Sequence, residues 1–111
     1  MKTVSLAVLL VVASGQASHA LDSEQQRGKA LLQTLCSKCH SIGVTGASPH
    51  PYAPPFRNFG DQKLYDEDFA QRLQTGLSTI HKDMPSFQFD RADAEAAVNY
   101  LKAIQVRKTP R

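Results

Sequence analysis

The pattern of apolar and polar residues predicts a first helix over residues 23–36. Its apolar residues form one helical stripe, which consists of Ala30, Leu31, Leu32 and Leu35. Ser23 is the expected N-cap, and Gln26 stands three positions later, where a capping box places its second residue. The stripe runs directly into Cys36, so we expect this residue at the end of the helix.

A second long helix is predicted near the other end of the chain, with Asp90 as its N-cap. Its apolar stripe follows i, i+3, i+4, i+7 spacing and consists of Ala94, Ala97, Val98, Leu101 and Ile104. Lys102, Arg107 and Lys108, near the end of this helix, are expected to complement the negative end of the helix dipole. A shorter helix is expected from about Asp66 to Thr75, with acidic residues in its first turn and Gly76 as its stop.

Two segments, residues 41–62 and 77–89, lack a regular pattern and are expected to be loops. In the first of them, glycines and prolines exclude a regular element: Gly43, Gly46, Pro49, Pro51, Pro54, Pro55 and Gly60. No segment alternates with a period of two, so no strand is predicted. The chain is therefore expected to be all-α, with helices at both ends and long loops between them. Long loops in a small domain commonly surround a ligand.

Residues 1–20 differ from the rest of the chain and predict a secretory signal peptide. A positive start precedes an apolar run from Val4 to Ala13, and small residues follow it. We expect cleavage after Ala20, or after Ala17. The run is shorter than the ~20 apolar residues that span a bilayer, and no later segment approaches that length. The expected division is a signal peptide over residues 1–20, followed by one secreted domain over residues 21–111.

Composition and charge exclude several classes of protein. The chain has 111 residues, of which 41% are apolar and 21% charged, and these values are ordinary for a globular domain. A formal net charge of +3, lowered by one if Lys2 is removed, is too small to indicate nucleic-acid binding. Two cysteines cannot form a disulfide scaffold. Because a domain this small commonly needs a disulfide, a metal or a cofactor for stability, we expect a cofactor.

Cys36, Cys39 and His40 form a C-x-x-C-H sequence, which is the attachment signature of c-type haem. At the end of a helix, the two thiols can form thioethers with the two vinyl groups, and the histidine then presents its imidazole to the iron. A thioredoxin-like dithiol would require a βαβ unit, and a structural zinc site would require four ligands, commonly in two spaced pairs. The sequence has neither, so we predict one covalently bound haem c.

The opposite side of the iron is filled by a second ligand or left open, and the candidates are Met84, His81 and His50. Met84 lies in a predicted loop before Pro85, whereas a methionine that only fills the core is expected within a helical stripe. Methionine ligation is typical of electron-carrying cytochromes. We favour Met84, with His81 as the second candidate. His50 lies between two prolines and is expected to be exposed to solvent.

With these residues the chain resembles class I cytochrome c, a family of small soluble monohaem electron carriers. Gly28, eight positions before the first cysteine, is similar to the glycine at which the family's terminal helices cross closely. The pair Tyr100-Leu101 resembles the aromatic residue and leucine of the family's last helix, and Leu32 matches an apolar position of its first. Ala97 stands where a larger residue is common. The resemblance implies a class I cytochrome c fold, with crossing N- and C-terminal helices and loops wrapped around the haem.

The same resemblance implies roles for two loops. Residues 53–56 are similar to the loop whose proline carbonyl accepts a hydrogen bond from the ligand histidine, a role we assign to Pro54, with Pro55 as the alternative. Residues 81–85 are similar to the family's distal segment, which carries the methionine ligand. Arg57 is implied to approach the haem propionates.

We therefore predict a periplasmic electron carrier and not an enzyme. It would act as a monomer that docks transiently on redox partner proteins, a dehydrogenase or reductase as donor and an oxidase or reductase as acceptor. Lys38 and Lys82 favour an acidic partner surface. Two alternatives stay open. One is a dedicated electron-accepting subunit of a periplasmic dehydrogenase, assisted by the basic residues Arg107, Lys108 and Arg111, and the other is an open-site gas-binding haem protein.

Overall fold

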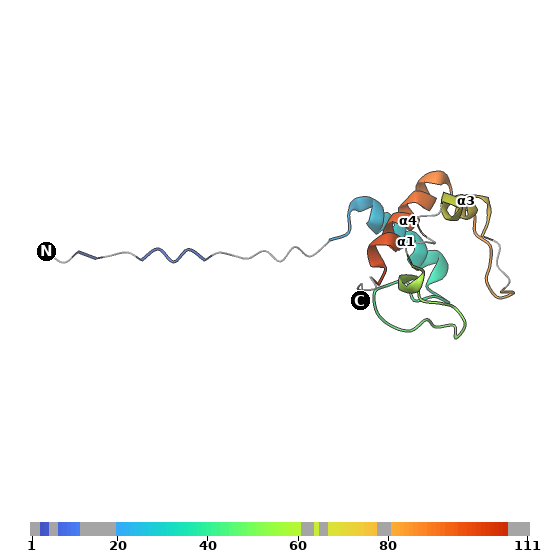
Figure 1. Ribbon diagram of the computed structural model, residues 1–111, viewed down its shortest axis with the longest axis horizontal. Helices are drawn as coiled ribbons and strands as arrows, with labels where there is room; N and C mark the ends of the chain where they lie inside the picture. Colours follow the sequence, from blue (N-terminus) through green and yellow to red (C-terminus); the bar gives the residue numbers. More distant parts are fainter. Residues whose placement is uncertain are drawn as a thin grey trace.

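The computed structural model describes residues 3–4, 7–11, 20–60, 64, 67–77 and 81–106. Within them the chain forms three α-helices and one short 3-10 helix: α1 (Ser23–Cys36), η1 (Phe56–Asn58), α3 (Glu67–Thr75) and α4 (Arg91–Ile104) (Figure 1). These described residues contain no strand, so the predicted all-α class is confirmed. None of their helices is long and apolar enough to cross a membrane.

The 3-10 helix η1 interrupts the loop expected over residues 41–62, and the sequence did not predict it. Pro55 is extended just before η1, with φ −60° and ψ 137°, and the Phe59 N–H closes the turn by donating to Phe56 O at 3.2 Å. A 3-10 helix needs only three residues, so it fits between the prolines and Gly60. The expectation that no regular element forms in this segment was therefore wrong over residues 56–58.

Helix α3 ends where the sequence predicted, because Gly76 takes a φ of +108°, which a residue with a side chain rarely adopts. Several other expectations concern parts of the chain outside the described residues. These are the start of this helix at Asp66, the alternative cleavage after Ala17 and the basic residues from Arg107 onward.

Helix α1 begins with a capping box one residue earlier than predicted. Asp22, not Ser23, is the N-cap, and its carboxylate accepts a hydrogen bond from Gln25 N at 2.8 Å. The Gln25 side chain accepts in return from Asp22 N at 3.0 Å, so Gln25 rather than Gln26 completes the box. A carboxylate at this position also lies in the positive field of the helix N-terminus, which a serine hydroxyl exploits much less.

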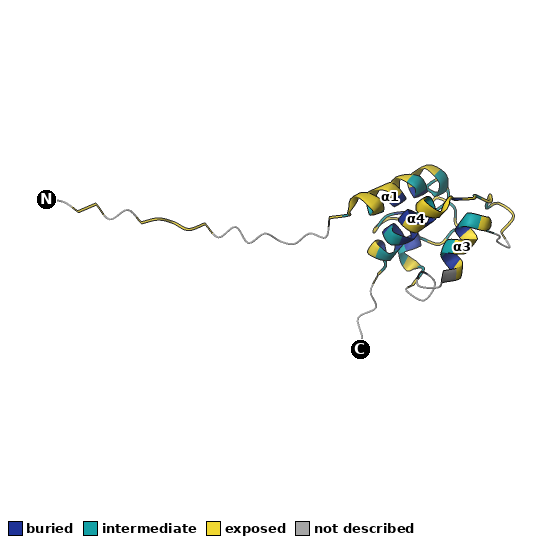
Figure 2. Ribbon diagram, turned by 90° about the horizontal axis from the view of Figure 1, so that it is seen from above, coloured by how far each residue is buried: buried dark blue, intermediate teal, exposed yellow. Residues whose placement is uncertain are grey.

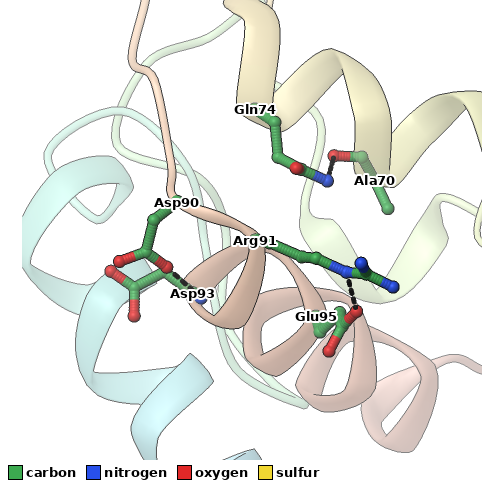
Figure 3. Close-up of polar contacts among 6 residues, drawn as sticks. All are labelled: Ala70, Gln74, Asp90, Arg91, Asp93 and Glu95. Carbon is green, nitrogen blue, oxygen red and sulfur yellow. Dashed lines mark hydrogen bonds and ion pairs between the residues drawn. The ribbon is translucent and has the colours of Figure 1, made fainter.

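Helix α4 begins as predicted. The Asp90 carboxylate accepts from Asp93 N at 2.8 Å, and in the next turn Arg91 Nε lies 3.0 Å from Glu95 Oε1 (Figure 3). Figure 3 also shows the neighbouring α3, whose Gln74 side chain donates to Ala70 O at 3.3 Å. The Asp90 cap and the Arg91–Glu95 pair belong to the first turns of α4, the helix on which α1 and α3 both pack.

Helices α1 and α4 cross at Gly28, as the sequence predicted. A β-carbon built on Gly28 would lie 2.0 Å from the Ala96 carbonyl oxygen, so only glycine fits at this crossing. Polar contacts flank the crossing: Asn99 Nδ2 donates to a Glu24 carboxylate oxygen at 2.8 Å. In Figures 1 and 2, the two helices cross, with buried residues where they meet and exposed residues along their outer faces.

The hydrophobic core is built around α4 and takes side chains from every described helix and from the loops. Its buried members are Leu32, Ile42, Phe56, Leu64, Phe69, Leu73, Phe89, Ala94, Ala97, Val98, Tyr100, Leu101 and Ile104. The predicted stripe of α4 is buried throughout, whereas that of α1 is buried only at Leu32. Ala30 is exposed, and Leu31 and Leu35 are half-buried. The difference arises because α4 contacts α1 along the face that holds Gly28 and Leu32.

Candidate haem site

The C-x-x-C-H segment spans the end of α1 and the turn after it. Cys36 is the last residue of the helix, and its carbonyl oxygen accepts from Cys39 N at 3.2 Å and from His40 N at 2.9 Å. The chain therefore stays tightly wound between the two cysteines and the histidine, although the helix has ended. Both cysteines are free thiols and half-buried. The structure thus brings together the three residues that the motif predicted.

The environment of Cys36 does not suit a redox-active dithiol. Burial, with the neighbouring Cys39 as the smaller cause, raises the pKa of the Cys36 thiol to about 11. Attack on a disulfide requires the thiolate, and reactive C-x-x-C pairs lower the pKa of one thiol to obtain it. The raised pKa of Cys36 is the opposite of that arrangement, so its environment disfavours a reactive dithiol.

His40 is held in one tautomer by a backbone carbonyl. Its Nδ1 lies 2.8 Å from Pro54 O, the contact that the resemblance had assigned to this pair. A carbonyl oxygen only accepts hydrogen bonds, so Nδ1 must carry the proton and donate it. In the neutral ring, Nε2 then keeps its lone pair and can bind a metal ion. Phe56 packs beside the same imidazole, with the two ring centroids 4.5 Å apart.

The loop that presents Pro54 is anchored to the residue after His40. Phe56 N donates to Ser41 O at 3.0 Å, and Arg57 Nη1 donates to the Ser41 hydroxyl at 3.1 Å. Pro54 and Pro55 restrict the backbone just before these contacts with Ser41, because the ring of each proline fixes its own φ. Ser41 carried no signal in the sequence, because its role depends on Phe56 and Arg57, which lie fifteen and sixteen residues downstream. The approach of Arg57 to a propionate stays a prediction.

On the distal side, Met84 is half-buried in a turn whose other residues are exposed. Its backbone N–H donates to His81 O at 3.2 Å, while the side chains of His81, Lys82 and Asp83 are exposed. Farther along, Phe89 is buried and its N–H donates to Leu73 O at 2.8 Å, which joins this segment to α3. Met84 is therefore the least exposed residue of this turn.

His50 is not solvent-exposed as the sequence analysis expected. Its side chain is 32% exposed, its Nδ1 accepts from Tyr52 N at 3.2 Å, and its Nε2 lies 3.6 Å from Asp83 Oδ2. The flanking prolines suggested a freely solvated loop, but the His50 backbone N–H donates to Cys39 O at 3.1 Å and draws the loop inward. Both ring nitrogens of His50 are engaged, which disfavours it as a distal ligand.

The described residues fit a haem better than the two rival sites. They contain no group of three or more histidine, cysteine or acidic side chains able to hold a metal ion, which disfavours structural zinc. They contain no strand on which a thioredoxin-like dithiol could be built. A shallow groove beside α1 includes none of the predicted site residues and is a separate feature, lined by Leu21, Gln26, Lys29, Ala30 and Gln33.

Two protonatable thiols and an imidazole with a free Nε2, set in an all-α domain with a largely apolar interior, define a helical protein that binds haem covalently. The comparison of sequences agrees, because a family model for cytochrome c matches residues 25–105. The chain belongs to the cytochrome c family. No curated protein and no solved structure matches it. The protein accordingly binds haem c covalently, takes part in electron transfer and has redox partners.

Proposed function

We propose that the protein carries single electrons in the periplasm, with haem c attached through Cys36 and Cys39 and its iron bound between His40 and Met84. The observation that carries this proposal is the 2.8 Å contact between His40 Nδ1 and Pro54 O. It commits the imidazole proton to the side away from the ligating nitrogen, and it raises the basicity of that nitrogen. A histidine so arranged is prepared for a metal ion before any binds.

Attachment through the two cysteines is supported by the tight turn that brings them together. Addition of a thiol across a vinyl double bond forms one carbon–sulfur and one carbon–hydrogen bond. The thiol supplies both the sulfur and the hydrogen, so the step needs no oxidant or reductant.

Ligation by Met84 is supported by the contrast within its turn. Its side chain is half-buried, whereas His81 is exposed and the ring nitrogens of His50 contact Tyr52 and Asp83. Pro85 also restricts the backbone of Met84, the residue before it, and so limits the conformations of the chain at this position. A neutral sulfur ligand opposite a histidine raises the reduction potential of an electron carrier.

When bound, the haem supplies a one-electron exchange between ferrous and ferric states. The chain has to hold both ligand side chains in the same places in the two states, and for His40 the contacts with Pro54 O and with the Phe56 ring serve this purpose. Partner proteins would dock transiently over a small area, as is usual in electron transfer. Lys38 and Lys82 are exposed and would face an acidic partner.

Location in the periplasm is supported by the apolar run near the start of the chain. Val8, Leu9, Leu10 and Val11 are 75–85% exposed and lie outside the core, as residues of a leader that is removed would. Covalent haem attachment outside the cytoplasm requires such an export signal.

Optical spectra of the purified protein and of Met84→Ala test the ligand set. We expect the wild-type ferric protein to show the weak near-infrared band of a sulfur–iron bond, and the ferrous protein to resist carbon monoxide. Met84→Ala should lose the band and bind carbon monoxide readily, while Lys82→Ala, an exposed neighbour, should behave as the wild type. A wild-type protein that binds carbon monoxide at once would instead identify the open-site gas-binding alternative.

A further inference from the structure

The side chain of Gln105 connects the end of α4 to the segment that contacts His40. Its Oε1 accepts from Gly60 N at 2.8 Å, and its Nε2 donates to Phe56 O at 2.8 Å and to Leu101 O at 2.9 Å. Gln105 is half-buried and is the first residue after α4, where the backbone becomes extended, with φ −62° and ψ 136°. One amide therefore holds both ends of residues 56–60 against the helix.

A second, backbone contact strengthens the same connection. Val106 N donates to Arg57 O at 3.1 Å, so two consecutive residues after α4 bind two consecutive residues of η1. Leu101 O belongs to the last turn of α4, whose carbonyls have no partner inside the helix. Gln105 thus caps α4 and holds η1 with the same amide group.

Phe56 connects the residues held by Gln105 to His40. Its carbonyl is bound by Gln105, its N–H donates to Ser41 O at 3.0 Å, and its ring centroid lies 4.5 Å from that of His40. Pro54, whose carbonyl accepts from His40 Nδ1, precedes Phe56 by two residues. Between them lies only Pro55, whose ring fixes its own φ. Because the backbone at Pro55 has little freedom to adjust, a displacement of Phe56 would also displace the Pro54 carbonyl.

We propose that Gln105 is a positioning residue for the proximal ligand, which sets the strength of the hydrogen bond between His40 and Pro54 and through it the reduction potential. This inference rests on the proposed function, because it takes His40 as an iron ligand. A strong Nδ1–H···O bond makes the imidazole a better electron donor and so favours the ferric state. Weakening that bond by releasing residues 56–60 should raise the reduction potential.

Two variants at this position separate its donor from its acceptor function. Gln105→Met keeps the length of the side chain and removes all three hydrogen bonds. Gln105→Glu keeps the acceptor for Gly60 N but places a carboxylate, which cannot donate, against the carbonyls of Phe56 and Leu101. Asn99→Leu is the matched control, because it removes another amide of α4, the one that donates to Glu24, and does not touch residues 54–60.

The decisive measurement is the exchange of the His40 Nδ1 proton with solvent, followed by proton NMR of the ferric holoprotein, together with the midpoint potential. We expect both Gln105 variants to exchange this proton at least about fivefold faster, the factor that corresponds to one ordinary hydrogen bond. The potential of Gln105→Met should rise. Gln105→Glu adds a negative charge, which by itself lowers the potential, so this variant is judged by proton exchange alone and provides the test if Gln105→Met does not fold. Asn99→Leu should leave exchange and potential unchanged even if it unfolds at a lower temperature.

The outcomes distinguish this inference from the proposed function. If the wild-type His40 ring signals show no hyperfine shift, His40 is not an iron ligand and the proposed function fails. If they are shifted as expected, but exchange in both Gln105 variants and the potential of Gln105→Met match the wild type, only the role of Gln105 is overturned. Equal changes in the Gln105 variants and in Asn99→Leu would also overturn it, because they would reflect general loosening of the fold.

Discussion

Gly28 in α1 meets the backbone of Ala96 in α4 so closely that a β-carbon on Gly28 would lie 2.0 Å from the Ala96 carbonyl oxygen. No rotamer relieves this clash, since the opposing atom is backbone and not the end of a flexible side chain. Both Ala96 and Ala97 are fully buried, so the helices cannot separate locally without opening the core. Helices α1 and α4 are thus joined at a point without spare volume.

Gly28→Ala should therefore destabilise the holoprotein even though alanine is the better helix former. Overpacking of a filled interior costs roughly 1–3 kcal/mol, which outweighs the ~1 kcal/mol that alanine gains within a helix. Unfolding by guanidinium chloride, followed by far-ultraviolet circular dichroism, measures the difference. Gly43→Ala is the control, because a β-carbon there meets nothing within 4 Å. Equal stability of the two variants would contradict a close crossing.

The capping register of α1 can be tested by comparing two adjacent residues. Asp22→Ala removes the acceptor for Gln25 N and should lower the free energy of unfolding by about 1 kcal/mol. Ser23→Ala should change it much less, because Ser23 lies inside the first turn and does not cap. The reverse order of effects in denaturant unfolding would restore Ser23 as the N-cap.

The position of this N-cap shows which details of the helices could be predicted from the sequence and which could not. The apolar periodicity located α4 and its cap at Asp90, because helix burial and local capping both depend on residues close together in the sequence. Periodicity alone could not choose between Asp22 and Ser23, since both side chains can cap a helix.

The contacts of the candidate site likewise fall into those that the sequence predicted and those that it did not. Local spacing brought Cys36, Cys39 and His40 together in the predicted turn, and the family resemblance supplied the partner Pro54. The contact of His50 with Asp83 and the two hydrogen bonds that join Gln105 to Gly60 and Phe56 were not predicted from the sequence. Each joins segments more than thirty residues apart through side chains whose types are common on any surface, so only the folded chain identifies them.

Covalent attachment gives a prediction about the two cysteines. Replacing both, in Cys36→Ala with Cys39→Ala, should remove the haem that survives denaturing extraction, as measured by the pyridine haemochrome spectrum. Each single variant should retain a haem with one thioether, and one remaining vinyl group shifts the absorption maximum of that spectrum to longer wavelength. Ser37→Ala, between the two cysteines, should retain the wild-type spectrum. Haem retained by the double variant after extraction would show that the thiols do not bind it.

Tyr100 should contribute to stability through its hydroxyl as well as its ring. The side chain is 2% exposed, and its hydroxyl donates to Ile42 O at 2.6 Å, a residue only two positions after His40. Tyr100→Phe leaves that buried carbonyl without its partner, which should cost about 1–3 kcal/mol in the free energy of unfolding at neutral pH. Tyr52→Phe is the control, because Tyr52 is 79% exposed.

Tyr100 should also make the free energy of unfolding depend on pH in the alkaline range. Burial raises the pKa of the Tyr100 phenol in the folded protein above its ordinary value. Above about pH 10 the unfolded chain releases this proton while the folded chain retains it, so the free energy of unfolding falls as the pH rises. The contribution is complete below the unfolded pKa and is lost as the pH rises through the folded one. Guanidinium unfolding between neutral and strongly alkaline pH should therefore show a shallower decline for Tyr100→Phe than for the wild type or Tyr52→Phe. Parallel declines in all three proteins would show that Tyr100 ionises equally easily in both states.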